Sequence, residues 1–131
     1  MKLTSLRIIS KDIKQCVQFY EKAIGVTPQW YTEDFAELST STITIAIGST
    51  RTMKMFGENI TGYEGYQSTI IEFLVADVDR EYEKIKGLTD HVVQEPTTMP
   101  WGNRSLLFRD PDGNLINFFT PVSVEAIQKF K

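Results

Sequence analysis

The sequence repeats one strand–helix–three-strand plan, and this repeat restricts the possible folds more than any other feature. The first copy opens with SLRIISKDIKQCVQFYEKAIG, in which a short apolar strand leads into Asp12 and then into apolar residues at helical spacing. The second copy, IIEFLVADVDREYEKIKG, has Asp77 in the same place. We therefore expect two strand–helix units, with Asp12 and Asp77 as helix N-caps and Gly87 as a helix C-cap.

Three short β-rich segments follow each expected helix. They are VTPQWYT, FAELS and TITIAIG in the first copy, and HVVQE, NRSLLF and NLINFF in the second. The pattern predicts an α+β fold of tandem βαβββ modules. The expected divisions are a first module at about 1–50, a connector at about 51–67, a second module at about 68–121 and a C-terminal helix at about 123–131. A chain of 131 residues has the size of one domain.

A tight turn is specified by DPDGN, near the end of the second copy. Pro111 suits position i+1 of a type I turn, Asp112 is tolerated at i+2, and Gly113 supplies the left-handed residue that closes a hairpin. We therefore expect the last two strands to pair with each other. The tail SVEAIQKFK follows, and Ser123 is its expected helix N-cap.

Charge and hydropathy exclude several classes of partner. The net charge of −3 and the pI of 5.2 lack the basic excess of a nucleic-acid-binding surface. The N-terminus MKLTSLRIIS has no apolar signal region, and no apolar run approaches the roughly 18 residues of a membrane span. We expect a cytoplasmic protein without nucleic-acid or membrane partners. The single cysteine, Cys16, excludes an internal disulfide and is expected to be a buried packing residue.

Three segments together resemble the vicinal oxygen chelate superfamily of glyoxalases, extradiol dioxygenases and bleomycin-resistance-type binding proteins. They are KDIKQCVQFYEKAIGV, VADVDREYEKIKG and EPTTMPWGNRSLLFRDPDGNLINFFTP, and the resemblance covers essentially the whole chain. It implies that the two modules pair so that their curved sheets form a cup. In the metalloenzymes of this superfamily, the cup holds a divalent metal with one ligand on each of four strands.

The resemblance also indicates where those metal ligands would stand. The four positions fall on Ser5, on Thr44 or Ala46, on Ile70 and on Asn117. Divalent metals in such sites need His, carboxylate or thiolate donors, so we expect no metal and no cofactor. The one histidine, His91, is far from these positions in the pattern. Glu37 and Glu72 would give a weak oxygen-rich site at best.

Strand alternation indicates which other side chains face the implied cup. Arg7 shares a face with Ser5, Glu72 with Ile70, and Phe119 with Asn117. Arg7 and Glu72 hold equivalent places in the two modules and would be buried charges. They would either pair with each other or contact a charged group of a ligand.

Aromatic residues border the cup in related proteins. Trp101, beside Pro100 and Gly102 in MPWGNR, offers a rigid ring for stacking on a planar ligand, and Arg104 offers a polar contact. No catalytic residues are predicted, because the motifs of nucleophilic catalysis are missing. The full set of predicted ligand-binding residues is Ser5, Arg7, Trp30, Phe56, Glu72, Trp101, Arg104, Asn117 and Phe119.

Two functions of different class remain, beside an inert dimeric scaffold. The favoured function is a metal-independent protein that binds or sequesters a small apolar or aromatic molecule. The alternative is a glyoxalase- or dioxygenase-type lyase or oxidoreductase with a non-standard site. Apolar residues in the connector further predict a homodimer, as is common in the family, or else a lid over the protein's own cup. These residues are Met53, Met55, Phe56, Tyr63 and Tyr66.

Overall fold

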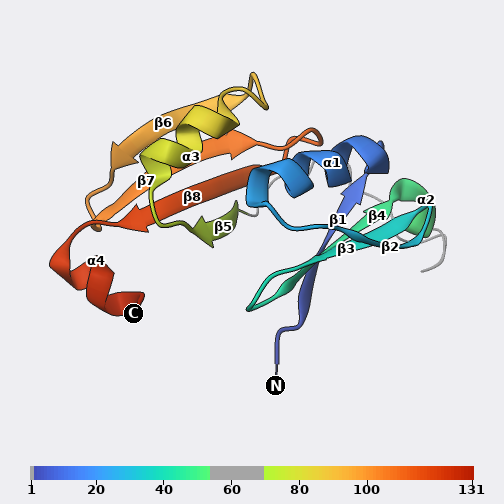
Figure 1. Ribbon diagram of the computed structural model, residues 1–131, viewed down its shortest axis with the longest axis horizontal. Helices are drawn as coiled ribbons and strands as arrows, with labels where there is room; N and C mark the ends of the chain where they lie inside the picture. The colour runs from blue at the N-terminus through green and yellow to red at the C-terminus, as the bar shows by residue number, and fades with distance from the viewer. Residues whose placement is uncertain (1, 54–69) are drawn as a thin grey trace. The chain divides into compact units, whose positions relative to one another are not determined.

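The computed structural model describes residues 2–53 and 70–131, and the chain divides into two compact units between Tyr66 and Gln67. This boundary falls within the predicted connector. Figure 1 shows that each unit is a sheet with a helix along it.

The first unit consists of β1 (Ser5–Ser10), α1 (Ile13–Ile24), β2 (Gln29–Thr32), β3 (Phe35–Ser39), β4 (Thr44–Ser49) and the short α2 (Thr50–Met53). Its strand order is β1-β4-β3-β2. β1 is parallel to β4, and the other two pairings are antiparallel. A parallel pair needs a long crossover connection, and α1 lies within it.

The second unit consists of β5 (Ile70–Leu74), α3 (Val78–Ile85), β6 (Val92–Thr98), β7 (Asn103–Arg109), β8 (Leu115–Pro121) and α4 (Val124–Lys129). Its strand order, β5-β8-β7-β6, with β5 parallel to β8, repeats the topology of the first unit. The predicted α+β fold of tandem βαβββ modules is confirmed.

The predicted N-caps are confirmed. Asp12 accepts a hydrogen bond from the Gln15 backbone N–H at 3.2 Å, and Asp77 accepts one from Arg80 at 3.1 Å. Ser123 accepts one from the backbone of Ala126 at 3.1 Å. Each bond satisfies one of the free N–H groups of a helix start, so the local sequence determines where these helices begin.

The prediction for Gly87 was wrong. The C-cap of α3 is Lys86, in a right-handed conformation with φ −62°, and the Gly87 N–H donates to the Lys84 carbonyl at 3.2 Å. The helix therefore ends in a tight right-handed turn that needs no left-handed residue. By contrast, α1 does end at a left-handed glycine, Gly25, with φ 70°.

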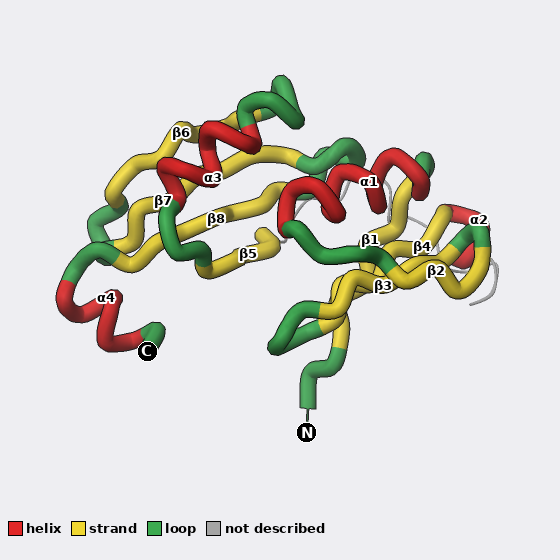
Figure 2. Tube along the Cα trace, viewed as in Figure 1, coloured by secondary structure: helices red, strands yellow, loops and turns green. Residues whose placement is uncertain are grey.

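Each helix covers one face of its own sheet. α1 packs on β1, β3 and β4, and α3 packs on β6, β7 and β8 (Figure 2). Cys16 on α1 has no exposed surface, which confirms that it is a packing residue. In the second unit, Phe108 and Phe118 meet edge to face with ring centroids 5.0 Å apart. The apolar stripe of each helix thus forms a core against one side of a sheet.

The β7–β8 turn has the predicted hairpin form. Gly113 is left-handed with φ 89°, and its N–H donates to the Asp110 carbonyl at 3.0 Å. The buried Asp110 carboxylate accepts from the Asp112 N–H at 2.9 Å and from both the N–H and Nδ2 of Asn114 at 2.8 Å. These bonds hold the turn that sets the register of β7 against β8.

Two left-handed glycines provide a matched test of backbone strain and packing. Alanine at Gly25 would meet no atom within 4 Å, whereas a Cβ at Gly102 would lie 2.0 Å from Ser123 Oγ, within the cap of α4. We expect Gly25→Ala to cost about 1 kcal/mol of unfolding free energy from backbone strain alone. Gly102→Ala should cost about 2 kcal/mol or more, because the cap must also move. Urea denaturation measures both values, and equal losses would contradict the role given to Ser123.

Candidate functional site

The face of the second sheet opposite α3 carries three of the predicted ligand-binding residues, Glu72, Asn117 and Phe119. Glu72, Asn117 and Leu107 are direct neighbours in one row across β5, β8 and β7. Directly opposed residues in neighbouring strands point to the same side of a sheet. This row therefore crosses the centre of a face that bears no crossover helix.

The first unit has an equivalent row. Arg7, Ala46 and Glu37 are neighbours across β1, β4 and β3. Because the two helix N-caps align Arg7 with Glu72, Ala46 is the counterpart of Asn117. Thr44, which pairs with Ser5, corresponds instead to Leu115, which pairs with Ile70. By this internal equivalence, the third position of the predicted metal-ligand set falls on Ala46 and not on Thr44.

Asn117 and Glu72 form a hydrogen-bonded pair on the face opposite α3. Asn117 Nδ2 donates to Glu72 Oε2 at 2.8 Å. An ionised carboxylate only accepts hydrogen bonds, so the amide nitrogen, and not Oδ1, must be the atom that faces Glu72. Asn117 is only 8% exposed, and its Oδ1 is buried with no hydrogen-bond partner among the described residues.

The rest of this face is largely apolar. Leu107, Leu115 and Phe119 flank Asn117 along the strands, and Ile70 and Leu74 on β5 are about half exposed. The Phe119 ring contacts Phe130, at the C-cap of α4, with centroids 5.0 Å apart. An apolar surface with one amide–carboxylate pair near its centre can bind the body of an organic molecule and orient one polar group.

The side chains at the four predicted metal-ligand positions do not suit the divalent metal of the family's enzymes. Ser5, Ala46, Ile70 and Asn117 supply no imidazole, thiolate or carboxylate. Across 2–53 and 70–131, no group of three or more His, Cys, Asp or Glu side chains is placed to hold a metal ion. Glu72 offers one carboxylate beside Asn117, and a single carboxylate with an amide makes a weak cation site.

The expectation that Arg7 and Glu72 are buried charges was wrong. Both side chains are exposed, as is Ser5 at the start of β1. The Arg7 guanidinium lies over the Phe35 ring, 4.9 Å from its centroid, which is a cation–π contact. A pair between Arg7 and Glu72 would join the two units and stays a prediction.

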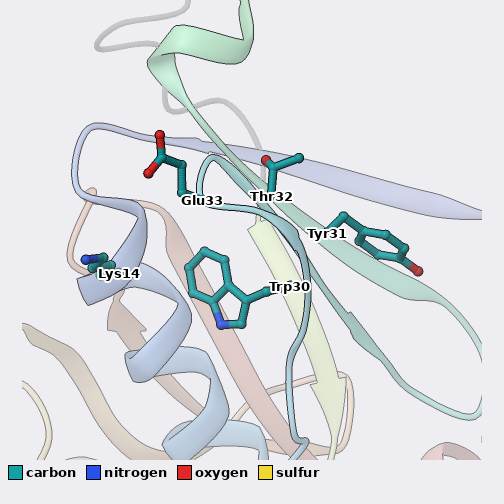
Figure 3. Close-up of a pocket in the computed structure, with 5 residues that line it drawn as sticks. All are labelled: Lys14, Trp30, Tyr31, Thr32 and Glu33. Carbon is teal, nitrogen blue, oxygen red and sulfur yellow. The ribbon is translucent and has the colours of Figure 1, made fainter.

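Trp30 lies on the other side of its sheet. It pairs with Ala36 on β3, on the side that α1 covers, and it lines a hollow of about 390 Å³ together with Lys14 of α1. Figure 3 shows the indole turned toward α1 while Tyr31 points away from it. A hydrogen bond to the Glu37 carboxylate raises the pKa of Tyr31. The structure therefore separates Trp30 from the row that contains Arg7.

Arg104 is also on the covered side of its sheet. Its Nε and Nη2 each donate to the Asp79 carboxylate of α3 at 2.9 Å. These hydrogen bonds hold the pKa of Asp79 below its ordinary value. An arginine in a two-point ion pair with its own helix is not available on the face of Asn117.

Trp101 is 64% exposed in the turn between β6 and β7, where the Gly102 N–H donates to the Met99 carbonyl at 2.9 Å. Its exposure is compatible with a role in ligand contact. Phe56 lies outside the described residues, as do Met55, Tyr63, Tyr66 and the side chain of Met53.

Ser105 is a site residue that the sequence reasoning missed. It is 3% exposed, its Oγ has no hydrogen-bond partner within 2–53 and 70–131, and it stands opposite Phe119 on the same face as Asn117. The DPDGN turn carried the necessary signal. Once Arg109 is paired with Leu115 across that turn, counting back along β7 brings Ser105 opposite Phe119.

Asn117→Glu tests the mismatch with a metal directly. The new carboxylate would stand beside that of Glu72 without any further metal donor, so we expect no tight binding of Zn²⁺ or Ni²⁺. The two like charges should also lower stability at neutral pH, and the loss should shrink as the pH falls and the pair takes up a proton. Metal titration by calorimetry and urea denaturation at two pH values check both. One tight equivalent of metal would contradict the ligand register assigned here.

The fold defines a class, that of proteins built from tandem βαβββ modules. The model of the Glyoxalase/Bleomycin resistance protein/Dioxygenase superfamily matches residues 2–118, and the chain belongs to this superfamily. The resemblance noted in the sequence is thereby confirmed.

Individual relatives agree with this assignment. The chain is 30% identical over 125 residues to the uncharacterized protein YraH of Bacillus subtilis, covering 91% of this chain and 98% of YraH. A glyoxalase/bleomycin resistance protein/dioxygenase family enzyme from Burkholderia phytofirmans superposes with a TM-score of 0.85 at 15% identity, over 93% of this chain and all of that one. A family member from Nocardioides superposes with a TM-score of 0.79 at 18% identity, over 95% and 85% of the two chains. These two structures are similar in fold.

Within the described ranges, no helix has the length and apolar character that crossing a membrane requires.

Proposed function

We propose that this protein binds a small apolar or aromatic molecule, without a metal, on the sheet face opposite α3. The observation that carries the proposal is the buried Asn117 amide at the centre of that face, in place of the carboxylate that the family's metalloenzymes use there. Exposed apolar surface at Ile70 and Leu74 adjoins it. A protein that binds by burying apolar surface needs such a face and no catalytic group.

Binding of the neutral apolar dye Nile red tests this proposal. We expect its fluorescence to rise with the intact protein and to fall to background with Leu74→Asp, which puts a charge on the proposed surface. Leu3→Asp is the matched control, because Leu3 is an exposed leucine outside this sheet. Equal dye binding by both variants would contradict the proposed location.

Trp101 contributes to the ligand contact in this proposal. Trp101→Ala should leave the melting temperature of the ligand-free protein nearly unchanged, because the side chain is 64% exposed. The stabilisation given by a saturating ligand should shrink, since a ligand stabilises only in proportion to its affinity for the folded state. A large loss of stability without ligand would make Trp101 a structural residue.

The alternative, a lyase or dioxygenase with a non-standard site, is tested by elemental analysis. Protein purified without chelators should contain no stoichiometric Ni, Zn, Fe or Mn. A full equivalent of any of these metals would contradict the metal-independent proposal.

The proposal includes a homodimer, as is common in this family, and a cytoplasmic location. Light scattering at micromolar concentration should give about twice the chain mass of 15.0 kDa. A mass equal to that of one chain would instead favour the connector as a lid.

A further inference from the structure

The three buried side-chain atoms that lack a hydrogen-bond partner, among the residues described, lie on one face of the second sheet. They are Asn103 Oδ1, Ser105 Oγ and Asn117 Oδ1. Asn103 pairs with Pro121, Ser105 with Phe119, and Leu107 with Asn117, so all three atoms belong to the face opposite α3. A buried polar atom without a partner lowers the stability of the fold, so three of them on one face indicate that a partner is missing there.

What these atoms lack is a donor. Two of the three are amide carbonyl oxygens, which only accept hydrogen bonds, and the third is a hydroxyl that can do either. The orientation of Asn117 is determined by Glu72, because its Nδ2 must face that carboxylate. Its Oδ1 therefore remains an acceptor whatever else happens on the face. A ligand complementary to this surface brings N–H or O–H groups.

The charge on the face is negative where Asn117 lies. Glu72 forms no ion pair with any described residue, and its one hydrogen bond there is the bond from Asn117. Arg109 lies on the same face but at the turn, where its Nη1 donates to the Gly113 carbonyl at 2.9 Å. An N–H group that contacts both Asn117 Oδ1 and Glu72 forms stronger hydrogen bonds if it carries a positive charge.

We infer that the ligand of this face is an organic cation, in which an ammonium or amidinium group is joined to an apolar body. Its charged nitrogen donates to Glu72 and to Asn117 Oδ1, and its apolar body covers Leu74 and Leu107. The inference rests on the proposed function and adds the charge and hydrogen-bonding class of the ligand. Carboxylates and phosphates are disfavoured, because they would stand against Glu72 and bring no donor for Asn117.

Three probes with one common body test the charge preference. They are 4-phenylbutylammonium, 4-phenylbutanol and 4-phenylbutyrate, each titrated into the full chain at pH 7 and low salt while the Asn117 side-chain NMR signal is followed. The ammonium probe should bind at least about tenfold more tightly than the alcohol, and the carboxylate should bind most weakly. Raising the salt concentration should reduce the advantage of the ammonium probe.

Variants separate the two polar contacts. Glu72→Gln should reduce the affinity of the ammonium probe to about that of the alcohol and leave the alcohol unchanged. Glu95→Gln is the control, because Glu95 is an exposed carboxylate that accepts from Tyr82 of α3. Asn117→Leu removes the unpartnered carbonyl, so it should raise the melting temperature without ligand while weakening the ammonium probe. A residue with a purely structural role would not show both changes.

The outcomes distinguish the two proposals. If the alcohol or the carboxylate binds as tightly as the ammonium probe, or if Glu72→Gln has no effect, the cation inference is overturned while binding at this face stands. If none of the three probes binds, the cation inference is overturned; if Nile red does not bind either, the proposed function fails with it.

Discussion

Phe108→Ala is expected to lower the free energy of unfolding by about 3–5 kcal/mol, the range for truncating a large aromatic side chain in a packed core. Phe108 has no exposed surface and lies under α3, edge to face with Phe118. The truncation removes that ring contact and leaves a cavity that strands on both sides prevent from closing. Urea denaturation followed by circular dichroism gives the value.

Trp101→Ala is the control for this experiment. It also removes a large aromatic ring, but one that is 64% exposed, so its cost should stay within about 0.5 kcal/mol. Similar losses for the two variants would show that burial does not distinguish these rings and would contradict the core described for the second unit.

Asp110→Ala is expected to lower the free energy of unfolding by about 3 kcal/mol, although it removes no apolar surface. The Asp112 N–H and both donors of Asn114 would lose their acceptor in a turn where Asp110 is 2% exposed. Buried donors left unpaired carry their full desolvation cost, and bonds to a charged acceptor are the stronger kind. Thermal and urea denaturation should agree on this loss.

Asp110→Asn gives a graded comparison. Its one carbonyl oxygen can still accept the two backbone N–H groups, while its amide nitrogen opposes Asn114 Nδ2. We expect about half the loss seen with alanine. If the two variants are equally unstable, the negative charge matters more than the hydrogen bonds that the structure shows.

Local signals made much of the fold predictable. Asp12 and Asp77 mark helix starts because a short acidic side chain can bond the free N–H groups that follow it, whatever the rest of the chain does. The DPDGN turn likewise determines its own conformation and, through it, the pairing of β7 with β8. The C-cap of α3 was misplaced by one residue, because a glycine after a helix permits a left-handed turn without requiring one.

The site was harder to predict, since it depends on partners far apart in the sequence. Alternation along β5 and β8 correctly placed Glu72 and Asn117 on one face, and their pairing follows from a register across 45 residues. Arg104 was expected to be a ligand contact, but its partner Asp79 lies on a helix 25 residues earlier. Nothing local to either residue shows that the two meet.

Trp30 illustrates a third difficulty. The pairing of β2 with β3 shifts register between Trp30 and Thr32, so alternation counted through that segment does not assign a side with certainty. Only the observed partner, Ala36, places the indole on the α1 side.

The position of the last strand in each sheet has a consequence for synthesis on the ribosome. β4 lies between β1 and β3, and β8 lies between β5 and β7, so the last of the described strands in each unit is a central one. Neither sheet can be completed from its earlier strands alone, because β1 and β5 have no other partner strand in the described part of the chain. Each half of the nascent chain must therefore remain incompletely folded until its last described strand has left the exit tunnel. A chain that stalls before Leu115 would lack β8, and β5 and β7 would then be exposed as unpaired strand edges that favour aggregation.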